Sequence, residues 1–315
     1  MLVGATPSRF KSARPQFSFP GPSLSIPTLL IPGATLFYRL LYILPKNLLS
    51  HLVGILTHCR YPFGLHTVLK NWFIKQYRIE TEEAEFPLEK YPTMGDFFVR
   101  KLKPGSRPIA QTALVSPVDG TLTQGGGFQP GNAVLTQIKG LEYNLHDLAG
   151  PGWNLEEYLQ GGFLTIYLAP YNYHRIHAPI DGQVTRVSYV PGALWPVNTW
   201  SVSHIPGLFV VNERITVELS GPEGKALVVM VGATNVGRIT LDFHSGMEGN
   251  RVPRDQAGHW QPPSPINLAK GQGLGCFELG STVILVLSKT LMEKVDQGLL
   301  VAGAKIVRMG QGLSP

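Results

Sequence analysis

The chain has 315 residues and a mass of 34.5 kDa, enough for one large domain, or a domain with an appendage, around a substantial buried core. Hydrophobic residues make up 43% and charged residues 15%, which excludes disorder throughout, while 35 Gly and 26 Pro exclude a coiled coil and favour turn-rich β structure. The net charge of +6 is uneven, because residues 1–79 hold nine of the 27 Lys and Arg and no Asp or Glu.

Residues 1–34 are predicted to be a mobile, Pro-rich extension. Five prolines fall between Pro15 and Pro32, a composition that supports neither a helix nor a packed strand. The uncharged stretch from Pro15 to Tyr38 is long enough to span a bilayer, but its prolines would leave backbone groups unpaired in lipid. We therefore expect no transmembrane helix here, and no secretory signal, since prolines interrupt the apolar run.

Residues 35–90 are predicted to form amphipathic helices that associate with a membrane. Apolar residues recur at helical spacing over 36–44 and 48–56, with Pro45 between them, and a third helix is expected over 66–77. Apolar faces with aromatic residues, flanked only by cations, suit helices that lie in the plane of an anionic membrane. The alternative, that these helices simply pack onto the rest of the protein, does not explain the missing carboxylates.

Residues 91–315 are predicted to form the main domain, a β-rich sandwich or open barrel that makes the chain α+β in class. Acidic residues over 80–89 mark the boundary, and a short helix is expected over Thr93 to Arg100. Beyond it, short apolar or alternating runs recur between Gly and Pro turns, as is typical of strands. The expected strands are Phe163 to Leu168, Gln183 to Val190, Arg214 to Leu219, Ala226 to Val231, Gly237 to Phe243 and Thr282 to Leu287.

A short repeat precedes two of the expected strands. Ser116-Pro-Val-Asp-Gly-Thr-Leu-Thr123 and Ala178-Pro-Ile-Asp-Gly-Gln-Val-Thr185 both contain Pro-x-Asp-Gly. Pro and Gly pre-form such a turn and Asp can cap it, so both aspartates have a structural explanation. The two copies suggest a duplicated hairpin unit.

Three local features carry the residue types of a reactive site: Asp119, the segment from His174 to His177, and Gly280-Ser281. Ser, His and Asp can supply a nucleophile, a base and an orienting acid in any chain order, which makes a hydrolase one interpretation. Ser281 has no G-x-S-x-G elbow around it, however, and this disfavours an ordinary α/β-hydrolase. Two cysteines and no H-E-x-x-H motif give no metal site, and none is predicted.

Several ordered blocks resemble the bacterial phosphatidylserine decarboxylase family. The resemblance runs from about Leu41 to the C-terminal region, and Leu279-Gly-Ser-Thr282 is specific in combination with the blocks that precede it. These blocks are Tyr42-Ile-Leu-Pro-Lys46, Phe97-Phe-Val-Arg100, Pro117-Val-Asp-Gly120, Tyr173-His-Arg-Ile-His-Ala-Pro179, Leu208-Phe-Val-Val-Asn-Glu-Arg214 and Val231-Gly-Ala-Thr-Asn-Val-Gly237.

The resemblance implies a self-processing enzyme. Ser281 would attack the carbonyl of Gly280, and cleavage between them would leave a large subunit, 1–280, and a small subunit, 281–315. Ser281 would become a pyruvoyl group at the new N-terminus. His177 is the implied base and Asp119 the carboxylate that holds its imidazole. Asp181, in the second Pro-x-Asp-Gly turn, is the competitor of Asp119, and the family pattern selects the first copy.

The reaction implied is decarboxylation of phosphatidylserine to phosphatidylethanolamine. The pyruvoyl group would form a Schiff base with the substrate amine and act as an electron sink, as pyridoxal phosphate does. His174 is expected to position the substrate or to protonate the carbanion, and its alternative explanation is a hydrogen-bonded wall residue.

A lipid substrate gives the basic helices a purpose, since they would dock the enzyme on anionic membrane. The resemblance points to the cytoplasmic face of a bacterial inner membrane, with an organellar membrane as the alternative because the basic, Ser-containing start also suits a transit peptide. No nucleic-acid partner is expected, and the sequence does not decide between a monomer and a homo-oligomer. Two other functions stay open: a non-enzymatic lipid-surface binding protein, and a Ser-His-Asp hydrolase that does not cleave itself.

Overall fold

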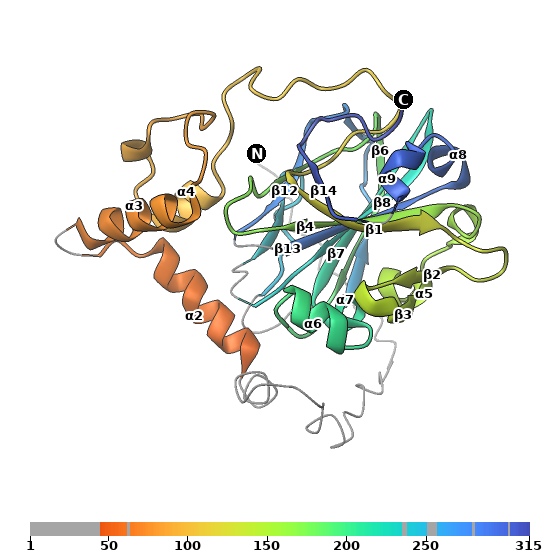
Figure 1. Ribbon diagram of the computed structural model, residues 1–315, viewed down its shortest axis with the longest axis horizontal. Helices are drawn as coiled ribbons and strands as arrows, with labels where there is room; N and C mark the ends of the chain where they lie inside the picture. The colour runs from red at the N-terminus through yellow and green to blue at the C-terminus, as the bar shows by residue number, and fades with distance from the viewer. Residues whose placement is uncertain (1–44, 62–63, 235–237, 251–256, 279–280, 302) are drawn as a thin grey trace, which may run out of the picture. The chain divides into compact units, whose positions relative to one another are not determined.

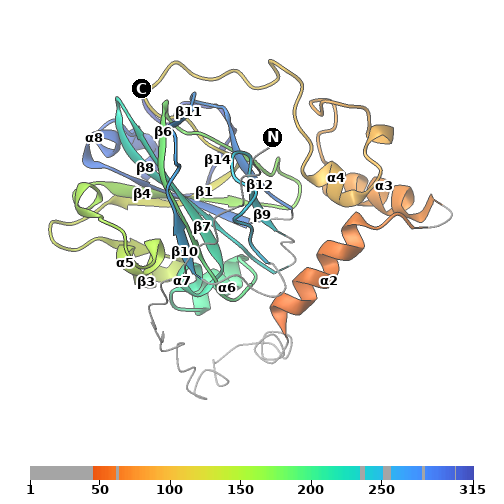
Figure 2. The same cartoon turned by 180° about the vertical axis from the view of Figure 1, so that it is seen from behind.

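Antiparallel strands form the main sheet of the protein. The computed structural model describes residues 45–61, 64–234, 238–250, 257–278, 281–301 and 303–315. Within them the main sheet has nine strands, whose labels are divided between Figures 1 and 2. Their order is β10 (Gly258–Trp260), β6 (Gly182–Val190), β7 (Arg214–Gly221), β8 (Gly224–Val231), β13 (Ser281–Leu287), β4 (Gly162–Leu168), β1 (Gly120–Gly127) and β14 (Lys305–Val307), and β11 (Ile266–Leu268) also pairs with β6.

Smaller elements complete the main domain. Two further sheets are β5 (Arg175–His177), β12 (Gly273–Phe277) and β9 (Ile239–Leu241), in the order β5-β12-β9, and β2 (Val134–Thr136) with β3 (Glu142–Asn144). The short helices are α5 (Leu145–Ala149), α6 (Thr199–His204), α7 (Leu208–Val211), α8 (Lys289–Met292) and α9 (Gln297–Leu300), with single 3₁₀ turns η3 (Leu88–Lys90), η4 (Ile138–Gly140) and η5 (Glu156–Tyr158).

The centre of the sheet is covered on both faces. All seven residues of β13 are buried, and so are the last six of β8, which explains why their sequences are continuous apolar runs rather than alternating ones. β13 pairs with β4 along its whole length and with β8 from Thr282 to Leu287. The strand that begins with Ser281 therefore belongs to the core of the domain.

The six strands expected from the sequence are present, and the predicted α+β class with a β-rich main domain and N-terminal helices is confirmed. The main sheet does not close into a barrel within the described residues. Both Pro-x-Asp-Gly turns lead into strands, β1 at Gly120 and β6 at Gly182, as the repeat predicts.

Three helices precede the main domain: α2 (Lys46–His58), α3 (Leu65–Tyr77) and α4 (Met94–Phe98). α4 is held by a capping box in which Thr93 and Asp96 bond each other's backbone N–H, and it packs against α2 and α3. The two views in Figures 1 and 2 show all three grouped at one edge of the domain. The predicted extension 1–34 and the first predicted helix, 36–44, lie outside the described residues.

The inner face of α3 packs on a small apolar cluster, while its outer face is exposed. Phe73 and Ile74 contact buried Ile79, Ala84, Tyr91 and Phe97. On the other side Val68 and Trp72 are 62% and 60% exposed. Leucines and Ile55 of α2 are exposed in the same way, so packing onto the protein accounts for only one face of each helix. No helix within the described ranges is long and apolar enough to cross a membrane.

Candidate functional site

Strand β5 brings the two candidate histidines next to the strand that leads to Ser281. His174 immediately precedes β5 and His177 ends it. β5 pairs with β12, and Phe277 N–H donates to the His174 carbonyl at 3.0 Å. The four steps of chain from Phe277 to Ser281 span at most about 14 Å, so the topology places His174 near the start of β13. His177 lies opposite Gly273, four residues farther back along β12.

Ser281 is fully buried between two strands. It lies opposite Leu168 of β4, its hydroxyl donates to the Val231 carbonyl of β8, and its Oγ accepts from Thr282 N–H at 2.6 Å. These contacts fix the hydroxyl in one orientation. Gly280, the predicted residue on the other side of the cleaved bond, lies outside the described residues.

His174 is a neutral, fully buried imidazole. Its Nδ1 donates to the Asn172 carbonyl at 2.8 Å, and its ring lies 4.2 Å from that of Phe98. Burial lowers its pKa to about 3, and the positive charge of Arg100 acts in the same direction. Its Nε2 is buried and has no hydrogen-bond partner among the described residues. Since Nδ1 carries the only proton, this Nε2 is an unused hydrogen-bond acceptor.

His177 has both ring nitrogens occupied. Nδ1 lies 2.7 Å from the Gly271 carbonyl, which can only accept, so Nδ1 is protonated. Nε2 then accepts from the Tyr173 hydroxyl at 3.0 Å. Burial is the main cause that lowers the pKa of His177, so the ring is neutral at neutral pH and its lone pair is on Nε2.

The turn whose carbonyl accepts a hydrogen bond from His177 Nδ1 depends on a glycine. Gly271 has φ +81°, a left-handed conformation, and a Cβ there would lie 2.5 Å from Ile109 Cδ1. Its N–H donates to the Ala178 carbonyl at 2.8 Å. Asp181 Oδ1 accepts from the neighbouring Lys270 N–H at 2.9 Å. The second Pro-x-Asp-Gly turn thus holds the loop that orients His177.

Asp119 is buried and faces an arginine. Its Oδ2 accepts from Arg107 Nη2 at 2.8 Å and its Oδ1 from Met309 N–H at 2.8 Å. Arg107 also pairs with Glu83. The two bonds that His177 makes go to Gly271 and Tyr173 rather than to Asp119, so the predicted direct contact between carboxylate and imidazole is not part of this arrangement.

Asp119 still lies near the imidazole. The backbone N–H of His177 donates to the Pro117 carbonyl, in the turn that carries Asp119, at 2.9 Å. The charge of Asp119 raises the pKa of His177 against the effect of burial. Asp181, by contrast, is exposed to solvent. The two copies of the turn therefore hold their aspartates in different environments.

Sequence reasoning missed three contributors to this cluster. Tyr173 stands beside His174 in the quoted block, and its position there was the only signal for it. Arg107 carries no motif, and Gly271 is one of 35 glycines, none of which the sequence marks as the partner of a histidine. All three act through contacts that are distant in sequence or that depend on backbone conformation.

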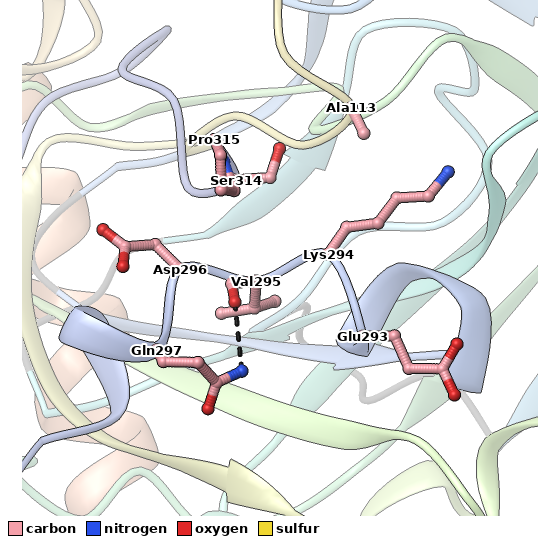
Figure 3. A pocket seen from close by; sticks show the side chains of 8 residues that line it. All are labelled: Ala113, Glu293, Lys294, Val295, Asp296, Gln297, Ser314 and Pro315. Atoms are coloured by element: carbon pink, nitrogen blue, oxygen red, sulfur yellow. Dashed lines mark hydrogen bonds between the residues drawn. The ribbon is translucent and has the colours of Figure 1, made fainter.

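A surface pocket of about 560 Å³ lies away from these residues. Figure 3 shows its lining, where Gln297 Nε2 donates to the Val295 carbonyl at 3.2 Å. The pocket is lined by Ala113, Glu293, Lys294, Val295, Asp296, Gln297, Ser314 and Pro315. None of the predicted site residues contributes to it. In the described part of the chain, no three His, Cys, Asp or Glu side chains are grouped to hold a metal ion.

Comparisons with known proteins give a consistent result. The family model described as phosphatidylserine decarboxylase matches residues 94–314, and a second model, PSD, matches residues 36–78. A "Phosphatidylserine decarboxylase proenzyme" of Anaeromyxobacter sp. (strain K) is 42% identical over 80% of this chain and 89% of its own length. The proenzyme of Myxococcus xanthus is 42% identical over 79% and 88%, and that of Methylobacillus flagellatus 40% identical over 82% and 92%.

Proposed function

Because the chain belongs to the phosphatidylserine decarboxylase family, we propose that it is a proenzyme that cleaves itself between Gly280 and Ser281 and then converts phosphatidylserine to phosphatidylethanolamine. The observation that carries the proposal is the burial of Ser281 at the first position of the central strand, four residues beyond Phe277, whose N–H donates to the His174 carbonyl. The two alternatives, a lipid-binding protein without activity and a hydrolase that stays intact, have no support from the relatives, which are named as proenzymes of a decarboxylase.

The residues present fit a pyruvoyl group made from Ser281. The backbone of β13 would hold the group, since pairing with β4 begins at Ser281 and pairing with β8 at Thr282. Once formed, such a group supplies a carbonyl that accepts the electrons released when carbon dioxide leaves. The small subunit, 281–315, would remain attached after cleavage, because its first strand lies between β4 and β8 in the middle of the sheet.

His177 is the proposed base of self-cleavage. Its lowered pKa keeps Nε2 unprotonated at neutral pH, as a base that takes the proton of Ser281 requires. The Gly271 carbonyl fixes the tautomer, and the Tyr173 hydroxyl holds the ring until the serine takes its place on Nε2. Asp119 acts through its charge, which favours the imidazolium that forms as the proton is transferred.

His174 is proposed to position the substrate rather than to donate a proton. A pKa of about 3 leaves Nε2 without a proton at neutral pH, and the proton on Nδ1 is bonded to Asn172. The unused acceptor on Nε2 suits a donor such as the substrate's ammonium group.

The experiment that tests the function uses freshly purified protein. We expect intact-mass measurement to find two chains, of 280 and 35 residues, with the shorter one beginning at position 281 and blocked at its N-terminus. The shorter chain should react with a hydrazine. The protein should also release labelled carbon dioxide from phosphatidylserine whose serine carboxyl group carries the label. A single chain that is inert to hydrazine would rule out the proposal.

We further propose that α2 and α3 dock the enzyme on the cytoplasmic face of the bacterial inner membrane. The support is the set of exposed apolar side chains on these helices, in a region that holds cations and no carboxylates up to residue 79. Docking would let the head group reach the site while the acyl chains stay in the bilayer.

Replacing Trp72 by serine should weaken binding to phosphatidylserine vesicles by about 10- to 100-fold, because burial of an aromatic side chain contributes roughly 1.5–3 kcal/mol. Flotation of the cleaved enzyme with these vesicles measures the effect. A matched control is Trp153→Ser, at a partly buried tryptophan of the main domain whose indole N–H bonds Ser188. Equal binding by the Trp72 variant, or salt-sensitive binding that is unchanged in a protein lacking residues 1–78, would contradict docking by these helices.

A further inference from the structure

Arg100 is a buried cation that the described structure leaves without a carboxylate. The residue is 5% exposed. The only hydrogen bond of its side chain among the described residues runs from Nη1 to the Phe97 carbonyl and is long, at 3.4 Å, and its Nε is buried with no partner there. The guanidinium lies over the Phe97 ring, 4.6 Å from the centroid. A buried, unpaired charge is costly, so this one calls for an explanation.

Arg214 shows what a purely structural buried arginine looks like in this protein. It too lacks a carboxylate within bonding distance in the described chain, but carbonyl groups surround it. Nε donates to the backbone carbonyl of Leu148 at 2.6 Å and Nη2 to that of Asp147 at 2.6 Å. Nη1 donates to the backbone carbonyls of Asn212, at 3.0 Å, and Val210. The donors of Arg214 are satisfied, whereas most of those of Arg100 are free for another acceptor.

Arg100 lies beside the proposed site. Its positive charge lowers the pKa of His174, and the charge of Asp119 acts on Arg100 in turn. The segment that carries it links the membrane-facing helices to the site, because the Phe98 ring lies 6.3 Å from Phe73 of α3 and 4.2 Å from His174. A lipid head group that enters from the side of α3 would therefore pass close to Arg100.

The substrate carries two anions, a carboxylate and a phosphodiester, and only one of them suits a fixed arginine. The carboxylate loses its charge when carbon dioxide leaves, so a tight ion pair with it would stabilise the starting state more than the transition state. The phosphodiester keeps its charge throughout. An arginine that holds it orients the head group without raising the barrier, and the guanidinium fork matches two phosphate oxygens.

We propose that Arg100 binds the phosphodiester of the substrate and thereby selects phospholipid-linked serine over serine compounds that lack phosphate. The assignment rests on the proposed function and names a specificity residue for it. Because Arg100 is 5% exposed and so largely dehydrated before the substrate arrives, little solvent has to be removed when the anion binds.

The test compares Arg100→Met with the parent enzyme on two soluble substrates, dihexanoyl-phosphatidylserine and O-hexylserine, which lacks the phosphodiester. We expect Arg100→Met to cleave itself as the parent does. Its KM for the phospholipid should rise about 10- to 100-fold with kcat changed little, as for loss of a charged hydrogen bond. Turnover of O-hexylserine should be unchanged, so the preference for the phospholipid should fall by the same factor.

Binding provides a second readout that does not depend on turnover. Glycerophosphoserine should raise the Tm of the cleaved parent in a concentration-dependent way, and it should raise the Tm of Arg100→Met much less. Lys101→Met is the matched control, because it removes a positive charge from the adjacent, exposed position and should leave both measurements as in the parent. Arg100→Lys, which keeps the charge and loses the fork, should give an intermediate KM.

Three outcomes would overturn the assignment. Equal losses of activity on both substrates would mean that Arg100 binds the substrate carboxylate or stabilises the fold. Loss of self-cleavage in both Arg100 variants would mean that it acts on Asp119 during maturation. An unchanged KM for the phospholipid would remove it from substrate binding altogether. In all three cases the activity and self-cleavage of the parent would still stand, so the proposed function is tested separately.

Discussion

Replacing Ser281 by alanine should leave one uncleaved chain of 315 residues and reduce decarboxylation by at least about 10⁶-fold. Without the hydroxyl there is no nucleophile for the peptide bond that precedes position 281, so no new N-terminus forms and no electron-accepting carbonyl appears. The fold should survive. The lost hydrogen bond to the Val231 carbonyl costs about 1 kcal/mol, while the backbone pairing of β13 is unaffected. Denaturing electrophoresis and release of labelled carbon dioxide measure the two effects.

Ser288 provides a matched control in the same part of the chain. It directly follows β13, is buried, and its Oγ accepts from Lys225 N–H at 3.0 Å. Ser288→Ala removes an equivalent hydroxyl and should lower the free energy of unfolding by about 1 kcal/mol, yet it should still yield the 35-residue chain. If the Ser281 variant were cleaved at the same site, or if it stayed intact but active, the proposed chemistry would be wrong.

The sequence predicted the long elements of the fold because their patterns are local. The helix over Leu65–Tyr77 follows from apolar spacing, and β8 and β13 follow from apolar runs bounded by turns. Strands of three residues, such as β2 and β5, were missed, since three residues show no period. β9 is shorter in the described chain than the run from Gly237 to Phe243 suggested.

The residues of the site could be named in advance, but their partners could not. The residue types and the family resemblance selected His177, while its Nδ1 bonds a carbonyl 94 residues away, in a turn set by the φ of Gly271. A sequence does not show which backbone carbonyl accepts a hydrogen bond from a side chain. The expectation that a carboxylate holds the imidazole therefore led to Asp119 instead. The sequence showed Arg100 only as part of Phe97-Phe-Val-Arg100. What distinguishes it is that its guanidinium has few hydrogen-bond acceptors in the described structure, and a sequence does not show this.

The second large effect is expected on the rate of self-cleavage when the aspartates of the two Pro-x-Asp-Gly turns are replaced. Asp119→Asn should slow self-cleavage about 10²- to 10⁴-fold, whereas Asp181→Asn should leave it near the parent rate. Asparagine at 119 removes the charge that favours the imidazolium of His177, and its amide N–H₂ has to face one of two donors, Arg107 or the Met309 N–H. Asparagine at 181 still offers an oxygen to Lys270 N–H, so the loop that holds Gly271 stays in place. Cleavage is followed by electrophoresis after the proteins are synthesised in a pulse.

The two substitutions are chemically identical and occur in the same turn sequence, so each is the control of the other. Asp119→Asn also breaks a buried ion pair, and although Arg107 keeps Glu83, we expect a cost of up to about 3 kcal/mol in the free energy of unfolding. The cleavage rate must therefore be expressed per folded molecule, with the folded fraction taken from near-ultraviolet circular dichroism. Full cleavage of the Asp119 variant beside a stalled Asp181 variant would transfer the role to the second turn, where Asp181 would act through Gly271 on the tautomer of His177.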